Sequence, residues 1–220
     1  MKRTLQAVIF DMDGVIVDTF ELYYLANKKI AEQLSVPFSR TDNEEFRGIR
    51  RMDIIESLAK RAKSNLSMQE KINLAKEKNK YYQELIESLD ERSILPGMKD
   101  FITQLKKRNI KLAIASSSTN CITVLKKIGL IHFFDCIVDP STIIKGKPNP
   151  EIFIKAAETL EIPHQNCVAI EDGEAGMKAI KSTKMFSIGI GNAVIEQEPD
   201  WYIDNSTELS VQELISRFEG

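Results

Sequence analysis

The sequence predicts an α/β fold: a Rossmann-like parallel sheet core with an inserted small α-helical cap domain. Three observations support this prediction. An apolar strand, Val8 to Phe10, lies close to the N-terminus and ends in two aspartates. The next segment, residues 20–89, shows only helical periodicity. From residue 98 onward, predicted helices and strands alternate, which is typical of a parallel sheet with helices on both faces.

The first strand supplies the first candidate site residues. Its continuous apolar run is expected of a strand that is covered on both faces. Asp11, Asp13 and Gly14 follow it directly. Two carboxylates at such a strand end repel each other, so a cation is the expected compensation. Taken alone, Asp11 and Asp13 are explained equally well by a structural role, with one as a helix N-cap and the other in a turn.

Apolar residues at helical spacing predict three helices in the cap. The predicted ranges are 20–34, 43–61 with an interruption at Gly48, and 67–89. Ser67 and Glu70 have the spacing of a capping box at the start of the third helix. The turn at Leu95-Pro96-Gly97 returns the chain to the sheet. The predicted domains are a core of residues 1–17 and 94–220, and a cap of residues 18–93.

The core pattern is regular after that turn. Helices are expected over residues 98–108, 120–128, 150–160, 173–182 and 211–218. Strands are expected over residues 111–115, 136–138, 167–170, 186–190 and 201–203. Because the strands are parallel, all their carboxyl ends lie at one edge of the sheet.

Polar residues follow the first four core strands at that edge. Three serines, Ser116 to Ser118, follow the second strand, and Lys147 comes in the loop after the third. Glu171 and Asp172 end the fourth. Carboxylates are preferred ligands of Mg²⁺, and hydroxyl, backbone N–H and lysine groups suit phosphate. The predicted metal ligands are Asp11, Asp13, Glu171 and Asp172.

The expected roles follow from charge and position. Asp11 is the predicted nucleophile and Asp13 the predicted acid and base. Ser116 is expected to bind phosphate, and Lys147 is favoured over Lys145 because Pro148 fixes its backbone. Ser117 and the serine after it are equally well explained as helix N-caps. His132 and His164 have no ligand-spaced partner in the sequence and are interpreted as surface or loop residues.

The composition narrows the class of protein. The 220 residues are 43% hydrophobic, and 30 basic against 32 acidic residues leave a net charge of −2. This balance gives no reason to expect nucleic acid or a membrane as partner. The three cysteines have no paired spacing and predict reduced, buried thiols, so we expect a cytoplasmic protein. No interface is indicated, and a monomer is the default expectation.

The ordered motifs resemble those of the haloacid dehalogenase superfamily of phosphotransferases. The resemblance rests on Asp11-Met12-Asp13-Gly14-Val15, Ser116, Lys147-Pro148 and Glu171-Asp172. It spans the whole chain, and the helical insertion resembles the small α-helical cap of that superfamily. It implies an aspartyl-phosphate intermediate on Asp11 and Mg²⁺ as cofactor.

Within the superfamily the chain is most similar to the β-phosphoglucomutase family. The similarity rests on the cap loop 47–51, the loop 115–120 and the segments 138–140, 145–148 and 170–176. It implies an isomerase that interconverts β-glucose 1-phosphate and glucose 6-phosphate, so the expected partner is a small-molecule sugar phosphate. It also implies that Arg51, Ser117 and Asn120 hold the phosphate that is not being transferred. Thr19 would lie at the hinge between cap and core. The cap residues Arg47, Gly48 and Lys78 would reach the substrate.

Three residues depart from that family's pattern. Tyr23 stands in place of a histidine, Thr119 in place of a lysine and Arg47 in place of another lysine. Tyrosine does not take up a proton near neutral pH, and Thr119 removes a positive charge. These departures are also compatible with a sugar-phosphate phosphatase that has the same fold. Separately, the run of residues 47–51 also fits a solvated helix face. A non-enzymatic phospho-acceptor module is the third hypothesis, against which the helical insertion argues.

Overall fold

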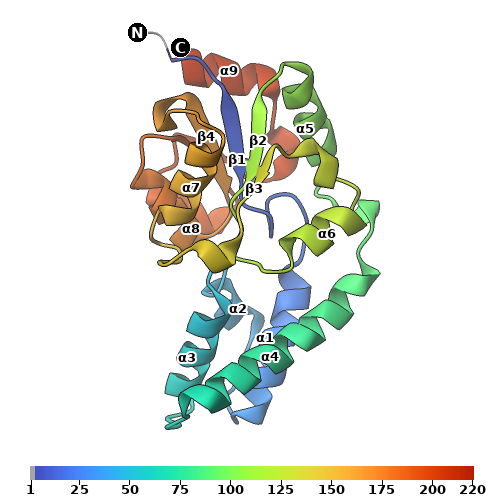
Figure 1. Cartoon of the computed structure of the whole chain (residues 1–220), viewed down its shortest axis with the longest axis vertical. Coiled ribbons are helices and arrows are strands. Elements are labelled where there is room, and N and C mark those ends of the chain that lie inside the picture. The colour runs from blue at the N-terminus through green and yellow to red at the C-terminus, as the bar shows by residue number, and fades with distance from the viewer. Residues whose placement is uncertain (1–2) are drawn as a thin grey trace.

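The computed structural model describes residues 3–220 and confirms the predicted α/β fold (Figure 1). One sheet has the strand order β3-β2-β1-β4-β5-β6, with every neighbouring pair parallel. The strands are β1 (Ala7–Phe10), β2 (Lys111–Ile114), β3 (Cys136–Ile137), β4 (Cys167–Glu171), β5 (Phe186–Ile190) and β6 (Trp201–Ile203). The chain builds outward from β1 on one side and from β4 on the other. The topological switch point therefore lies between β1 and β4, where such sheets bind ligands.

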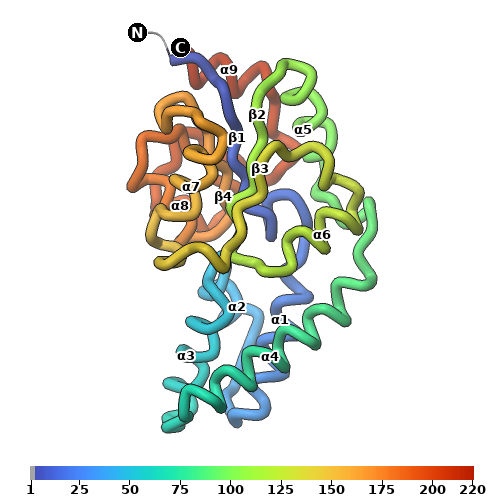
Figure 2. The backbone as a smooth tube through the Cα atoms, in the orientation of Figure 1, coloured from blue at the N-terminus to red at the C-terminus, as the bar shows by residue number. Residues whose placement is uncertain are grey.

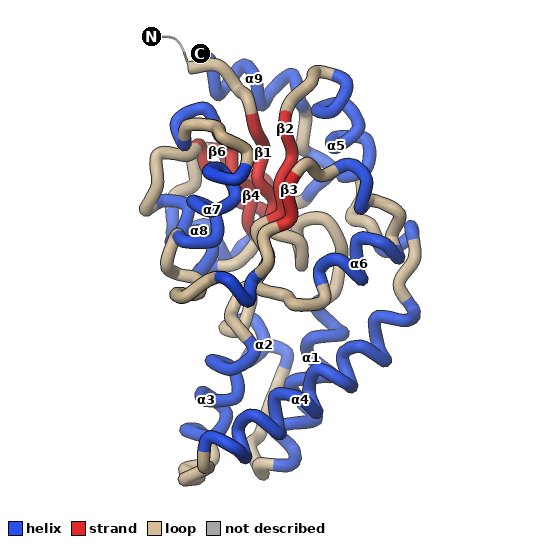
Figure 3. The backbone as a smooth tube through the Cα atoms, viewed as in Figure 1, coloured by secondary structure: helices blue, strands red, loops and turns tan. Residues whose placement is uncertain are grey.

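Alternate residues of the strands are buried on opposite faces of the sheet. Val8 and Phe10 of β1 face the layer of α5 (Met98–Lys107), α6 (Cys121–Lys127) and α9 (Val211–Glu219). Ala7 and Ile9 face α7 (Glu151–Thr159) and α8 (Glu174–Lys181). All four side chains are fully buried, as the apolar run predicts. Figure 3 shows the strands between these helices.

The cap consists of α1 (Phe20–Gln33), α2 (Arg40–Glu44), α3 (Arg51–Arg61) and α4 (Met68–Leu85). It has its own apolar core, built from residues such as Ile30, Ile55 and Leu58. Two linkers join it to the sheet and run side by side (Figure 2), since Asp18 N donates to Ser93 O and Leu95 N to Ile16 O. The domain boundaries at residues 17/18 and 93/94 stay a prediction.

The cap helices correct the sequence prediction in two places. The predicted helix 43–61 is two helices, and its first part begins earlier, at Arg40, where Ser39 provides a capping box with Asp42. The break is longer than expected, because residues 45–50 connect the two helices and Gly48 has a φ of +71°. The third helix ends at Leu85 and continues as the 3₁₀ turn Ile86–Ser88. Its capping box of Ser67 and Glu70 is confirmed.

The core elements agree closely with the predicted ranges. β5 and β6 have the predicted bounds, and β2, β3 and β4 differ from them by one residue at the carboxyl end. Gly97 of the predicted turn is the N-cap of α5, with a φ of +80°. Cys121, Cys136 and Cys167 are free and buried, as expected. None of the helices in residues 3–220 has the length and apolar character to cross a bilayer.

Candidate active site

Three carboxylates meet at the switch point between β1 and β4. Asp11 directly follows β1, Glu171 is the last residue of β4, and Asp172 comes next. The register pairs Phe10 with Ile170, which brings the two strand ends level. One oxygen of each carboxylate lies within 4.8 Å of the others, and all three residues are buried. This group could hold a metal ion.

Two cations balance these carboxylates. Lys147 Nζ lies 2.5 Å from Asp11 Oδ1 and 2.8 Å from Glu171 Oε2, and its side chain is fully buried. Arg47 reaches down from the cap, and its Nη1 lies 2.5 Å from Asp172 Oδ2. The site thus joins an acidic cluster of the core to a basic residue of the cap, and Lys145 lies exposed outside it.

Burial and neighbouring charges together set the pKa values of these groups. Burial raises the pKa of Asp11 to about 6, although Lys147 opposes the shift. It also raises the pKa of Asp172 to about 7, although Arg47 opposes that shift. Burial alone would lower the pKa of Lys147, but the charges of Asp11 and Glu171 outweigh it and raise that pKa above its usual value. Lys147 therefore stays charged at neutral pH.

Gly14 allows the loop after β1 to pass close to Asp172. Its φ is +79°, and a Cβ at this position would lie 2.0 Å from Asp172 Oδ2. The tight loop also directs Asp13 back toward α1. There the carboxylate of Asp13 accepts a hydrogen bond from Thr19 Oγ1 at 2.6 Å and a longer one from the Tyr23 hydroxyl at 3.4 Å.

Asp13 has its own electrostatic environment, separate from the three-carboxylate group. Burial, followed by the charge of Asp11, raises its pKa to about 7. The group found among residues 3–220 contains Asp11, Glu171 and Asp172. The assignment of Asp13 as a fourth metal ligand stays a prediction.

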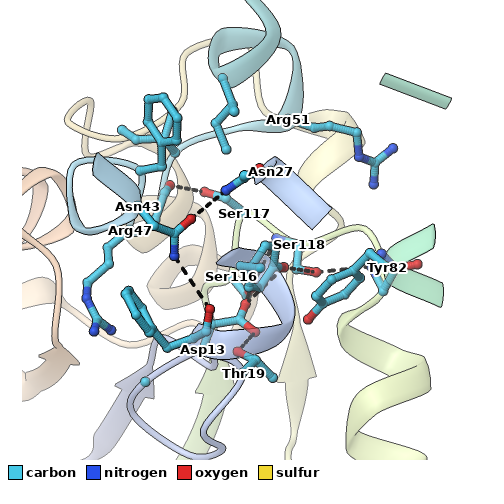
Figure 4. Close-up of a pocket in the computed structure, with 18 of the residues that line it drawn as sticks. Asp13, Thr19, Asn27, Asn43, Arg47, Arg51, Tyr82, Ser116, Ser117 and Ser118 are labelled. Atoms are coloured by element: carbon cyan, nitrogen blue, oxygen red, sulfur yellow. Dashed lines mark hydrogen bonds between the residues drawn. The ribbon is translucent and has the colours of Figure 1, made fainter. Parts of the chain in front are cut away.

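The serine loop after β2 lies against both Asp13 and the cap (Figure 4). Ser116 Oγ donates to Asp13 Oδ2 at 3.5 Å and accepts from the backbone N–H of Ser118 at 3.1 Å. Ser117 Oγ donates to the carbonyl of Gly48 in the cap loop at 2.8 Å. The N-cap of α6 is Asn120, so the N-cap interpretation of Ser117 and Ser118 is wrong.

Ser118 is a site residue that the sequence analysis did not assign to substrate binding. It is buried, and its Oγ is hydrogen-bonded to the Tyr23 hydroxyl at 2.9 Å. Tyr23 in turn stacks on Tyr82, with ring centroids 4.3 Å apart. The departure at Tyr23 therefore places a phenol, fixed on both sides, between Asp13 and the serine loop.

The residues predicted to hold the phosphate that is not being transferred contact other side chains where the cap meets the serine loop. Arg51 Nη2 donates to Thr119 Oγ1 at 2.5 Å, and Asn120 Nδ2 donates to Asn79 Oδ1 at 2.9 Å. Lys78 is 3% exposed, and its ammonium lies 5.4 Å above the Tyr23 ring. Burial, helped by Arg51, lowers the pKa of Lys78 to about 7.

One cavity connects the two groups. Of the predicted site residues, those that line it are Asp11, Asp13, Thr19, Arg47, Gly48, Arg51, Lys78, Ser116, Ser117 and Asn120. Lys147, Glu171 and Asp172 contact this set through Asp11 and Arg47. Further lining residues include Phe20, Asn27, Asn43, Phe46 and Tyr82, which the sequence analysis did not assign to the site. Of these residues, Asn27 and Asn43 carried a sequence signal, because each is a polar residue on the buried face of a cap helix.

Comparison with known proteins agrees with this arrangement. The family model for haloacid dehalogenase-like hydrolases matches residues 5–183. A β-phosphoglucomutase of Bacillus subtilis is 42% identical over 217 residues, which cover 98% of this chain and 96% of that protein. A phosphorylated carbohydrates phosphatase of Thermotoga maritima is 29% identical over 202 residues, covering 87% of this chain and 91% of that protein.

A solved structure is similar over nearly the whole chain. The crystal structure of a β-phosphoglucomutase from Clostridium difficile has a TM-score of 0.94 and 36% identity, covering 98% of this chain and 97% of that one. The four motifs, the parallel sheet, the cap and this family match agree with one another. The chain belongs to the haloacid dehalogenase-like hydrolase family.

Proposed function

We propose that the protein is a phosphotransferase of the β-phosphoglucomutase type, an isomerase that interconverts β-glucose 1-phosphate and glucose 6-phosphate. The observation that carries the proposal is a cavity that Asp11 lines together with two cationic groups of the cap, Arg51 and Lys78. Lys147 lies behind this lining and contacts Asp11. A mutase must bind a sugar with two phosphates, one at each end. The 42% identity to the Bacillus subtilis β-phosphoglucomutase supports the same reaction.

Asp11 is the proposed nucleophile. In the first half-reaction, one of its carboxylate oxygens forms a bond to phosphorus while the bond between phosphorus and the donor's oxygen breaks. The released oxygen takes a proton from Asp13. In the second half-reaction, Asp13 removes the proton from a sugar hydroxyl, which takes the phosphoryl group from Asp11. The phosphate thus leaves one oxygen and arrives on another.

Asp13 is suited to this proton transfer in both directions. Its pKa of about 7 means that both protonation states are accessible near neutral pH. Thr19 Oγ1, at 2.6 Å, orients the carboxylate from the linker at the start of α1. Because Thr19 lies where the cap joins the core, we propose that it couples the orientation of Asp13 to the position of the cap.

Mg²⁺ is the proposed cofactor. Asp11, Glu171 and Asp172 would hold it, because they offer three clustered carboxylates, the oxygen ligands that this ion prefers. A bound Mg²⁺ would offset the negative charge of the phosphoryl oxygens. The residues of the chain do the remaining work: Lys147 balances Asp11, and Ser116 offers a hydroxyl to the phosphate.

The cap end is the proposed site of the phosphate that is not being transferred. Arg51 can bind it bidentately, and Asn120 and Ser117 can donate hydrogen bonds from the serine loop. Lys78, buried beside Arg51, adds a second charge when protonated. Arg47 and Gly48 close the cavity from the cap loop, where Gly48 O meets Ser117.

A sugar-phosphate phosphatase is the second candidate function. Tyr23 favours it, because a phenol cannot take up a proton as the expected histidine can. The Thermotoga maritima relative, a phosphorylated carbohydrates phosphatase, shows that a similar chain carries that function. In this reading water replaces the sugar hydroxyl in the second half-reaction. The phospho-acceptor module is set aside because the chain belongs to an enzyme family.

A paired assay separates the two enzyme functions. One sample with Mg²⁺ receives β-glucose 1-phosphate and a trace of glucose 1,6-bisphosphate, and both glucose 6-phosphate and inorganic phosphate are followed. A mutase forms glucose 6-phosphate far ahead of phosphate. Phosphate alone would reject the mutase proposal in favour of the phosphatase. We further propose that the protein is cytoplasmic, that it is a monomer and that its partner is the sugar phosphate. Gel filtration with light scattering tests the oligomeric state.

A further inference from the structure

Two asparagine side chains meet in the wall of the cavity, on the cap side (Figure 4). Asn27 comes from α1 and Asn43 from α2, and they are only 1% and 3% exposed. Asn27 Nδ2 donates to Asn43 Oδ1 at 2.7 Å. We refer to Asn27 and Asn43 as the amide pair. Neither side chain carries a charge, so the pair adds no positive charge for a phosphate.

The direction of the hydrogen bonds in the amide pair is set by the backbone. Asn43 Nδ2 donates to the carbonyl oxygen of Phe20 at 3.5 Å, and that oxygen can only accept. The Asn43 carbonyl must then face Asn27, so Asn27 offers its NH₂ group to it. Reversing the amide of Asn27 would bring two carbonyl oxygens together. The orientation of Asn27 is therefore fixed by the bonds of its neighbours.

This orientation leaves one acceptor of the pair unused. Asn27 Oδ1 is buried and has no hydrogen-bond partner among residues 3–220. The other such side-chain atom in that range is the hydroxyl of Tyr82, which lines the same cavity. Leaving a buried acceptor unpaired costs free energy, and native proteins normally satisfy it. Both residues line the cavity in which a ligand would be bound.

We propose that the amide pair recognises a hydroxyl group of the sugar, and that Asn27 Oδ1 accepts the hydrogen bond from it. This inference rests on the proposed function, which places a sugar phosphate in the cavity. A carbonyl oxygen needs a donor, and a phosphate dianion has none to give, so the amide pair selects the neutral part of the substrate. Arg51, and Lys78 when protonated, also line the cavity and attract the phosphate.

The rest of this wall is suited to the body of a sugar ring. Phe46 and Ile54 also line the cavity on the cap side and offer apolar contact. A cavity with an apolar wall and a small number of oriented polar groups is typical of specific small-molecule sites. The amide pair would thus determine which sugar and which ring orientation are accepted. A site built to bind a hydroxyl rejects analogues that lack it.

The test compares Asn27→Leu with the unmodified protein on β-glucose 1-phosphate and its 2-, 3- and 4-deoxy derivatives. Turnover is the sum of the 6-phosphate formed from each sugar (glucose 6-phosphate or the corresponding deoxyglucose 6-phosphate) and inorganic phosphate, so it reports either enzyme function. For the parent sugar, we expect Asn27→Leu to lower kcat/KM about 10-fold. For one deoxy derivative, the unmodified protein should show a similar loss, and Asn27→Leu should add none. The matched control, Asn73→Leu, removes an exposed amide from α4 and should change nothing.

Equal losses on the parent sugar and on all three deoxy derivatives would overturn the inference, since Asn27 would then only support the fold. So would an unmodified protein that processes all three derivatives as well as the parent, which would mean that only water satisfies Asn27. If Asn27→Leu does not fold, Asn27→Ala removes the same acceptor with a smaller side chain. It should lower kcat/KM for the parent sugar about 10-fold and add no loss for that deoxy derivative, and equal losses on all four sugars would contradict the inference. A protein that turns over an aryl phosphate but no sugar phosphate would reject the proposed function itself, a distinct result.

Discussion

Replacing Lys147 by methionine should strongly destabilise the metal-free protein. Methionine keeps much of the volume of the lysine side chain but removes the charge that lies 2.5 Å from Asp11 and 2.8 Å from Glu171. The side chains of Lys147 and Glu171 are fully buried, so no water replaces the lost partner. Removing one partner of a buried ion pair costs about 3–5 kcal/mol. That is a large part of the roughly 5–15 kcal/mol that stabilises a typical domain.

Urea unfolding at pH 7.5 without Mg²⁺ measures this cost. Lys145→Met is the matched control, because Lys145 is exposed two residues away, and it should shift the free energy of unfolding by less than about 0.5 kcal/mol. Adding Glu171→Gln to Lys147→Met removes one unbalanced charge. The double variant should therefore lose about 1–3 kcal/mol less than the sum of the single losses. A Lys147→Met variant as stable as the control, or a strictly additive double variant, would refute the reasoning.

Three further predictions concern catalysis and pH. Asp11→Asn should abolish phosphoryl transfer to any acceptor, and residual transfer above a few per cent would reject Asp11 as the nucleophile. Arg51→Ala should lower mutase kcat/KM by about 10- to 100-fold, the worth of a hydrogen bond to a charged group, and leave aryl phosphate hydrolysis nearly unchanged; equal losses would mean that Arg51 does not hold the second phosphate. Burial raises the pKa of Asp172 to about 7 in the folded protein, so the unfolded chain releases this proton first as the pH rises. We therefore compare the free energies of unfolding of Asp172→Asn and the unmodified protein without metal. The value for Asp172→Asn minus that for the unmodified protein should increase between about pH 4 and pH 7. A difference that does not change with pH would contradict the raised pKa of Asp172.

The core of the fold was predictable because its elements follow local rules. The run from Ala7 to Phe10 is apolar throughout, since both faces of β1 are covered by helices. Once the strands are parallel, their carboxyl ends must meet, which brings Asp11 and Glu171 together without any knowledge of packing. The capping box at Ser67 is equally local, because all its bonds span three residues.

The cap side of the site was less predictable because its contacts join distant parts of the chain. Arg47 meets Asp172 across 125 residues, and Tyr23 meets Ser118 across 95. Apolar periodicity located the cap helices, but it does not register Asn27, a polar residue on a buried face. The prediction of one helix over residues 43–61 was wrong because apolar periodicity continues on both sides of Gly48. This periodicity does not reveal that α2 begins separately, at a capping box of Ser39 and Asp42.

The central claim is that phosphate passes from Asp11 to a sugar hydroxyl rather than to water. It is tested most directly by mixing the enzyme with one equivalent of ³²P-labelled glucose 1,6-bisphosphate, then adding excess unlabelled β-glucose 1-phosphate. If the sugar hydroxyl is the acceptor, the label leaves Asp11 almost wholly as sugar phosphate. Label recovered mainly as inorganic phosphate would contradict transfer to the sugar and would identify the protein as a phosphatase.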